Sequence, residues 1–458
     1  MRNSIKEIIY RIKTDNKRVF YIICILFSIM LSFIQLYGDD ITGMRVENGS
    51  IVDYWKYSVY LCSIWTSRLF VNFVIFLFSD NRYTFIWAAY MGLSLYVLMY
   101  SFSKLFAGDS SKECNLVIAS IIMLFPWHYL NNAGWIATMT TYLSPTAFGF
   151  FSLIPIKKYL CGQKLKWWEG VVYSLALIYG ANLEQMMVVI LGSYTAAVVY
   201  FAVIKKKYVY LWIQLILSFA SCLMTILSPG NFIRKKDEII NWYKSWDMLN
   251  KIDKVDLGYS TTMQWLLFGS HIFMIAICCL FTFIIWKKYK RLSFLSIAGV
   301  PTLLVILLGP LRSITVTMYP NIKDLTDSIE RNGLVTVANR GNLSAFSKYM
   351  IWAAMIILLC MVVVLLQDSI RMLIVSFVLI CTGGASRVVM GFSPTIYASG
   401  PRTFAVMVFC IMGVACCTYS NSIKLGYINK EDETKISVIA NVLLLFSMIN
   451  ILLQVAKV

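Results

Sequence analysis

The sequence contains few charges and almost no histidine. Only 14% of its 458 residues are charged, and the only histidines are His128 and His271, so a metal site built on histidine is not expected. The twelve cysteines are scattered, mostly inside apolar runs and without metal-ligand spacing, and are interpreted as small hydrophobic residues. The sequence also lacks a phosphate-binding loop and a dinucleotide-binding glycine pattern. These absences exclude the common nucleotide-binding motifs and a histidine-based metal enzyme.

Long apolar runs dominate the chain instead. Hydrophobic residues make up 59% of the sequence, and the mean hydropathy is +0.71. Stretches of about 20 apolar residues, long enough to cross the ~30 Å hydrocarbon core of a bilayer, recur from end to end. Because backbone polar groups in lipid must be paired within the segment, these spans must be helices. We predict an all-α, polytopic membrane helical bundle of about 12–13 transmembrane helices, in a single integral membrane domain over residues 1–458.

The distribution of positive charge predicts which loops face the cytoplasm. In a chain this apolar, we attribute the formal net charge of +18 to loops held on the cytoplasmic side, and we expect no nucleic-acid partner. The basic N-terminus, residues 1–18, is predicted to be cytoplasmic, followed by an uncleaved first span. This orientation makes residues 38–59, 228–262 and 310–348 external loops. Lys, Ile and Asn are frequent, as in low-GC bacteria, so the predicted location is the plasma membrane of a bacterium.

The following spans alternate in direction. Residues 60–78 are predicted to run inward and residues 83–103 outward. Residues 167–204 contain no Lys, Arg or Asp and lie between lysine clusters, which predicts a hairpin that goes out and returns. Its helix break is "YGAN", before Glu184. The later spans are expected near 263–286, 292–309, 349–367, 371–388, 403–420 and 436–455.

The segment between residues 104 and 156 does not fit this alternation. Ser103 is predicted outside and Lys157 inside, so the chain must cross an odd number of times. Neither apolar piece in this segment is long enough to be assigned as a span. A re-entrant segment, which membranes allow where the backbone lines a cavity, is the simplest solution. It would place Trp135 and Tyr142 on the outer side.

Polar and charged side chains gather at the external face in this topology. An ionisable group inside a span costs about 2.5–3.5 kcal/mol on insertion scales, so Arg68 and Glu184 need a reason to be there. They form either a structural ion pair or part of a site that faces a cavity. The cations at residues 234–236 lie in a loop that is predicted to be external, which conflicts with the positive-inside rule. Either one upstream crossing is miscounted, or these cations face an anion on the outer side. The other residues predicted to face the site are Asp39, Asp40, Trp135, Tyr142, Asn182, Gln185, Asn231, Arg234, Arg387 and Arg402.

This set of residues suits chemistry on a lipid-linked sugar. A carboxylate can act as general base on a sugar hydroxyl, Arg and Lys can hold a phosphate, and Trp135 can stack on a sugar ring. Because there is no ATP outside the cell, we predict a polyprenyl-phosphate sugar as donor and a cell-surface glycan as acceptor. The reaction would be glycosyl transfer with the lipid phosphate as leaving group. An acidic pair can also bind a divalent cation, so metal dependence stays open.

Six short motifs in order resemble a known family. They are "GDD" at 38–40, "WTSR" at 65–68, "GWIATMTTYLSP" at 134–145, "GANLEQ" at 180–185, "SPGNFIR" at 228–234 and "SPTIYASGPR" at 393–402. An Asp-Asp pair in the first external loop is typical of GT-C-type glycosyltransferases. The chain resembles an uncharacterised bacterial multi-pass family related to these enzymes and to the O-antigen glucosyltransferases.

The resemblance implies a GT-C-like fold with an external active site. It implies Asp39 or Asp40 as the catalytic acid/base and Glu184 in the cavity. It also implies that Arg234 and Arg402 lie near the donor phosphate.

Two other functions remain open. A lipid-linked glycan transporter or flippase also needs cations in an apolar bundle, but its passage must open to both sides, often through internal repeats, and no clear repeat is present. A polysaccharide polymerase or ligase also acts on lipid-linked glycans outside the cell, typically through Arg and His in large external loops. Turnover separates these functions, because an enzyme modifies the glycan and a transporter only moves it.

Overall fold

Every regular element that the computed structural model describes is helical. The described residues are 15–41, 49–79, 84–108, 111–323 and 343–456, and no β-strand occurs among them. Parts of the predicted N-terminal segment and of the 38–59 and 310–348 loops lie outside these ranges. The chain divides into two compact units. Unit 1 comprises Met1–Phe232 and Asn429–Val458, and unit 2 comprises Ile233–Ile428.

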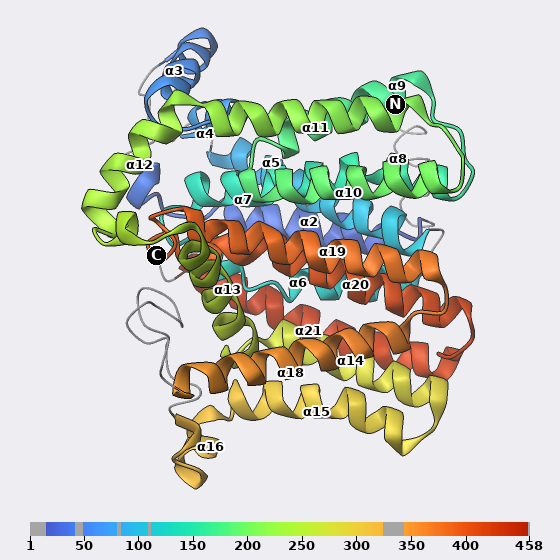
Figure 1. Ribbon diagram of the computed structural model, residues 1–458. Helices are drawn as coiled ribbons and strands as arrows, with labels where there is room; N and C mark the ends of the chain where they lie inside the picture. Colours follow the sequence, from blue (N-terminus) through green and yellow to red (C-terminus); the bar gives the residue numbers. More distant parts are fainter. Residues whose placement is uncertain (1–14, 42–48, 80–83, 109–110, 324–342, 457–458) are drawn as a thin grey trace. The chain divides into compact units, whose positions relative to one another are not determined.

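Eight helices within the described ranges are long and apolar enough to cross a membrane (Figure 1). The count rises to nine if α15 (Leu292–Leu308) and α16 (Arg312–Met318), which meet at 88°, form one bent span. These helices support a multi-pass membrane protein. The eight are α5 (Thr84–Phe102, continued to Ala107), α10 (Glu184–Val203), α11 (Val209–Leu227), α14 (Ile272–Tyr289), α18 (Leu343–Leu366), α19 (Ile370–Val388), α20 (Ala405–Lys424) and α21 (Lys430–Ala456).

The count is lower than the about 12–13 spans predicted from apolar length, because several predicted spans are short or broken. The first, α2 (Arg18–Leu31), has 14 residues, about 21 Å at 1.5 Å per residue. The span predicted over residues 60–78 is divided into α3 (Ile51–Ile64) and α4 (Leu69–Phe78). The span predicted over 263–286 is interrupted where α13 (Lys251–Phe268) ends and α14 begins.

Helix α7 (Trp135–Ser152) is the buried centre of unit 1. All of its 18 residues except Phe148 and Phe151 are buried, and it packs against α4, α5, α9 (Trp167–Gly180) and α10. Three of its hydroxyl groups, those of Thr141, Ser144 and Thr146, donate to carbonyls one turn back, so these polar side chains can be buried with a partner. The segment "GWIATMTTYLSP" is therefore mostly an internal helix and not an external or re-entrant loop.

The lysines of unit 1 mark one end of its helices. After α7, the short helix α8 (Ile154–Leu160) carries Lys158, whose Nζ lies 2.6 Å from Glu169 Oε1 at the start of α9. Tyr159 stacks on Tyr208, with ring centroids 4.2 Å apart, which brings the Lys205–Lys207 turn to the same end. We call this the lysine end of unit 1. The N-terminus of α7 lies at the opposite end.

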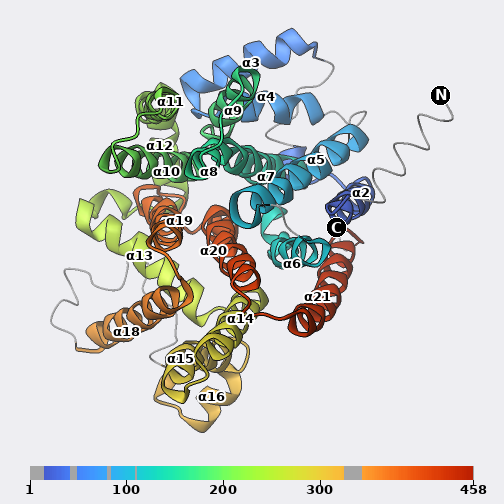
Figure 2. The ribbon, with the colours of Figure 1, turned by 90° about the vertical axis from the view of Figure 1, so that its right-hand side faces the viewer.

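Helix α5 runs toward the lysine end, against the predicted direction. Trp87 near its start donates to Thr140 Oγ1 at 2.9 Å, and Phe102 at its end contacts Phe150, with centroids 5.0 Å apart. Thus α5 is parallel to α7, and Figure 2 shows the two helices packed side by side. The prediction placed Ser103 and Lys157 on opposite sides, whereas the end of α5 lies beside the end of α7 and α8.

This direction removes the need for a re-entrant segment between residues 104 and 156. Helix α6 (Lys112–Met123) starts near the beginning of α2, since Asn115 donates to the Asn16 carbonyl at 3.0 Å. It ends near the end of α2, where Phe27 and Trp127 have centroids 5.0 Å apart. Helix α6 therefore leaves the lysine end and α7 returns to it. The hairpin predicted over residues 167–204 is confirmed as α9 and α10, joined at 181–183.

Unit 2 contains most of α12 (Pro229–Trp242), the helices α13 to α16 and the helices α18 to α20. Helix α19 packs on α20 and on α13, and α14 on α15. At one end, Lys288 Nζ lies 2.8 Å from Asp368 Oδ1 and Tyr427 donates to the same oxygen at 2.9 Å. Because α19 starts and α20 ends there, Arg387 and Arg402 lie at the opposite end of this unit.

Labelling of single cysteines with a membrane-impermeant maleimide tests the direction of α5. With the exposed Cys161, Cys279 and Cys381 replaced by serine, we expect Lys112→Cys to be labelled from the same side of the membrane as Lys206→Cys, because both positions lie at the lysine end. Asp39→Cys should be labelled from the other side. Labelling of Lys112→Cys together with Asp39→Cys would contradict the described path of the chain.

Candidate functional site

The two neighbouring aspartates of unit 1 have different environments. Asp40 is fully buried, and its carboxylate accepts hydrogen bonds from the backbone N–H groups of Ala137 at 2.8 Å and Ile136 at 3.3 Å. It thereby pairs N–H groups in the first turn of α7, which have no partner within the helix. Asp39 is exposed, and only its backbone is fixed, by an N–H bond of 2.9 Å to the Ala133 carbonyl.

A glycine makes this arrangement possible. Gly134 precedes α7 with φ +114°, and a Cβ there would lie 2.5 Å from Asp40 Oδ1. A larger residue would both strain the backbone and displace the carboxylate. The pair at 39–40 forms a short 3-10 turn with Gly38. This turn directs one carboxylate into the protein and leaves the other in solvent.

Burial raises the pKa of Asp40 to about 6, while hydrogen bonds from the first N–H groups of α7 lower it and the neighbouring Asp39 raises it slightly. Removal from water thus has a larger effect than the helix N-terminus. A carboxyl in this position holds the structure together and has no exposed surface for a substrate. Asp39 is the carboxylate of this pair that a substrate can reach.

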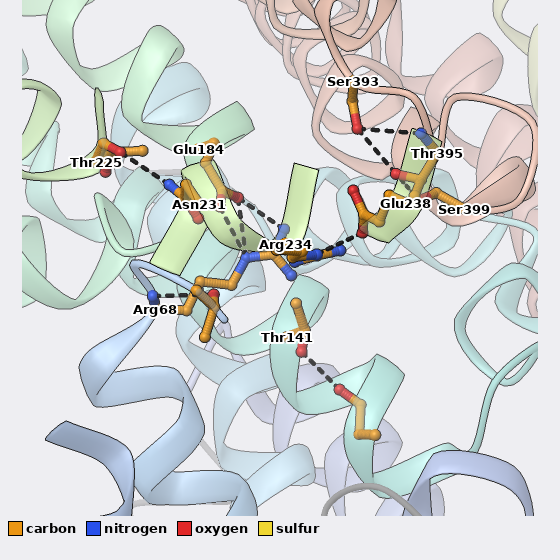
Figure 3. Close-up of polar contacts among 12 residues, drawn as sticks. Arg68, Thr141, Glu184, Thr225, Asn231, Arg234, Glu238, Ser393, Thr395 and Ser399 are labelled. Atoms are coloured by element: carbon orange, nitrogen blue, oxygen red, sulfur yellow. Dashed lines mark hydrogen bonds and ion pairs between the residues drawn. The ribbon is translucent and has the colours of Figure 1, made fainter. Parts of the chain in front are cut away.

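Arg68 and Glu184 form an ion pair within unit 1 (Figure 3). Arg68 Nε lies 3.0 and 3.1 Å from the two carboxylate oxygens, and Nη2 lies 2.8 Å from Oε2. The side chains are 21% and 29% exposed. This paired, fork-like geometry favours the structural interpretation of the two residues, although the pair also reaches the surface.

The same loop caps helix α4. Asn182 Oδ1 accepts from the N–H groups of Phe70 at 2.9 Å and Val71 at 3.2 Å. The start of α12 also reaches the α3–α4 break, where a Cβ on Gly230 would lie 2.6 Å from the Trp65 nitrogen. Three motifs therefore meet at one place in unit 1, those at 65–68, 180–185 and 228–231. The motifs at 38–40 and 134–145 meet each other at the start of α7.

The other predicted site residues of unit 1 are engaged or buried. Trp135 is fully buried and Tyr142 nearly so, so neither ring presents an open face to a sugar in this structure. Gln185 is also buried. Asn231 donates to the Thr225 carbonyl at 2.8 Å and stabilises the turn between α11 and α12.

Three of the four predicted arginines belong to unit 2. Arg234 pairs with Glu238 one turn along α12 (Figure 3). Arg387 is buried, with its guanidinium carbon 4.2 Å from the centroid of the Phe404 ring. Arg402 is half-buried, and its Nε has no hydrogen-bond partner among the described residues. The segment before Arg402 is ordered by hydroxyl contacts of Thr395 with Ser393 at 2.8 Å and with Ser399 at 3.1 Å.

Two features were not expected from the sequence. One is that the buried position of the Asp40 carboxylate requires a glycine at residue 134. The glycine in "AGW", directly before a helix, is the sequence signal that could have suggested it. The other is Trp246, a buried tryptophan in the polar segment "NWYKSWDMLNK" of unit 2, with two lysines against its ring. Within the described residues, no group of three or more His, Cys, Asp or Glu side chains could hold a metal ion.

Replacing each aspartate in turn should separate their roles. Asp40→Ala leaves buried N–H groups of α7 without an acceptor, so we expect the free energy of unfolding to fall by about 1–3 kcal/mol. Asp39→Ala should change it by no more than about 0.5 kcal/mol. Thermal unfolding of both purified variants in one detergent measures this. Equal losses of unfolding free energy in the two variants would contradict the assignment of Asp40 as buried and Asp39 as exposed.

Exchanging the charges of Arg68 and Glu184 tests the ion pair. Each single reversal, Arg68→Glu or Glu184→Arg, places like charges together and should lower the unfolding temperature. The double variant should recover part of the loss, with a coupling of about 1 kcal/mol or less because both side chains are partly in solvent. If the double variant loses as much stability as the two single variants together, Arg68 and Glu184 do not form a structural pair.

Comparisons with known proteins do not identify this chain. No protein-family model, no curated protein and no solved structure matches it. The function therefore has to be argued from the side chains of the site.

Proposed function

We propose that the protein is a membrane glycosyltransferase that moves a sugar from a polyprenyl-phosphate donor to a cell-surface glycan. The observation that carries the proposal is Asp39. It is an exposed carboxylate on a turn that is anchored by the buried Asp40 and by α7, the most buried helix of unit 1. A catalytic group on such a rigid support is held in one place at little entropic cost during reaction.

In the proposed reaction, Asp39 acts as general base on the acceptor. It takes the proton from an acceptor hydroxyl as that oxygen forms a bond to the anomeric carbon of the donor sugar. The bond from that carbon to the phosphate oxygen breaks, and the polyprenyl phosphate leaves with the electron pair. The proton ends on Asp39 and returns to water. No oxidant and no nucleotide is needed.

The leaving phosphate requires a cation, and Arg402 is the one that the family resemblance implies. Its guanidinium is half-buried and its Nε lacks a protein partner among the described residues, as expected of a group that meets a ligand. Arg234 is already neutralised by Glu238, so we assign it a lesser role. Arg68 and Glu184 neutralise each other and are proposed to position α4 and α10.

The proposed location is the plasma membrane of a bacterium, with the N-terminus in the cytoplasm and Asp39 outside. The support is that Lys158 and Lys205–Lys207 gather at the end of unit 1 opposite Asp39. Cytoplasmic loops carry an excess of Lys and Arg. This orientation presents Asp39 to glycans at the cell surface.

Sugar and linkage analysis of the surface polysaccharides tests the proposal. A deletion strain would be complemented with the parent chain, with Asp39→Asn, or with the matched control Asp237→Asn, another exposed aspartate. General base catalysis contributes about 10²–10⁴-fold to a rate. We therefore expect Asp39→Asn, at equal membrane abundance, to leave one sugar branch missing, as in the deletion strain, and Asp237→Asn to restore it.

Two results would contradict this function. A polymer that is chemically unchanged but retained inside the cell would favour transport. A polymer that is shortened as a whole would favour polymerisation or ligation. Full complementation by Asp39→Asn would leave glycosyl transfer possible but would remove Asp39 as its base.

A further inference from the structure

Unit 2 holds an unusual arrangement of two lysines on one tryptophan. Trp246 begins the short 3-10 helix Trp246–Met248, between α12 and α13. Its ring is 2% exposed and packs with Tyr243, Leu257 and Ile396. Its indole N–H donates to the Gly391 carbonyl at 3.2 Å. Apolar packing and this hydrogen bond together hold the ring in position.

Both ammonium groups lie against this ring. Lys254 Nζ, from α13, is 3.4 Å from the ring centroid, and Lys235 Nζ, from α12, is 4.5 Å from it. Distances below about 6 Å are typical of cation–π contacts. Lys254 is half-buried and Lys235 is exposed. Two elements separated by a loop thus bring two positive charges to one aromatic side chain.

The two charges are not neutralised by the protein. Neither ammonium forms an ion pair with a carboxylate among the described residues. The pKa of Lys254 is lowered by burial first and then by the charge of Lys235, while Asp247 and Asp253 only partly offset this. The carboxylate of Asp253 is directed elsewhere, to the Asn250 N–H at 3.2 Å. Like charges held this close repel each other, and a cation–π contact supplies no counter-charge.

The backbone around Lys254 is held tightly. A Cβ on Gly391 would lie 1.9 Å from the Lys254 carbonyl oxygen, and a Cβ on Gly258 would lie 2.0 Å from that of Val388. The segment Val389–Phe392 therefore packs closely on the first turns of α13. This fixes where the Lys254 side chain begins.

We propose that Lys235 and Lys254, held on Trp246, form a binding site for a phosphate group. A phosphate carries the charge that this pair lacks and can accept hydrogen bonds from both ammonium groups at once. The phosphate belongs either to a membrane lipid headgroup or to a soluble phosphate. The inference concerns unit 2 alone and does not depend on glycosyl transfer, because a transporter of phosphate-bearing lipids would use the same site.

Acetylation of lysines by a water-soluble N-hydroxysuccinimide ester, read by peptide mass spectrometry, tests the site. The full chain would be studied in phosphatidylcholine nanodiscs, first with inorganic diphosphate added and separately with phosphatidic acid in the disc. Only the unprotonated amine reacts, so a bound phosphate that raises the lysine pKa by one unit slows acetylation about tenfold. We expect this slowing at Lys235 and Lys254. Lys236 and Lys251, exposed neighbours on the same two helices, are the internal controls.

A pair of variants shows whether the two lysines act together. Lys254→Gln should remove the protection of Lys235, whereas Lys251→Gln, which removes the same charge from the same helix, should leave it. Protection by diphosphate alone identifies a soluble phosphate, and protection by phosphatidic acid alone identifies a lipid headgroup. Either result supports the site. Absence of protection by both probes, or equal protection of all four lysines, would overturn it, and this footprint of the unchanged chain is decisive even if a variant does not fold.

Discussion

The buried carboxylate of Asp40 at the start of α7 is the interaction on which unit 1 depends. A helix that begins inside a protein has N–H groups that neither water nor the helix can pair. Asp40 accepts from two of them, and Gly134 leaves the room for it to do so. With its N-terminus satisfied, α7 can be buried almost along its whole length, and α4, α5, α9 and α10 pack on it.

Within each unit, the ionisable residues predicted from the sequence as site residues fall into two kinds. Some are paired within the protein, as Arg68 is with Glu184 and Arg234 with Glu238. Their contacts join or stiffen segments, and their charge is already balanced. Others, such as Asp39 and Arg402, have no charged partner among the described residues and reach solvent at least in part. Charges that the protein leaves unbalanced at a structured position are the ones that a ligand can use.

The cations at residues 234–236 illustrate the same distinction within one helix. Arg234 is paired with Glu238, Lys235 rests on Trp246, and Lys236 is exposed. In the sequence they form a single basic cluster that conflicts with the positive-inside rule. In the structure they have three different environments, and only Lys235 joins a second lysine at an aromatic ring. A count of charges in a loop does not distinguish these cases.

Apolar length and the placement of lysines were enough to predict a helical membrane protein and the hairpin at 167–204, because they report directly on lipid and on turns. They did not determine the direction of α5 or the helical state of α7. Both depend on which helices pair, and several hydroxyl groups of α7 are satisfied by its own carbonyls, which hydropathy does not register. Which aspartate of "GDD" faces solvent likewise depends on tertiary structure. Helix α7 begins at Trp135, 95 positions after Asp40, and its first N–H groups bind the Asp40 carboxylate and leave that of Asp39 in solvent.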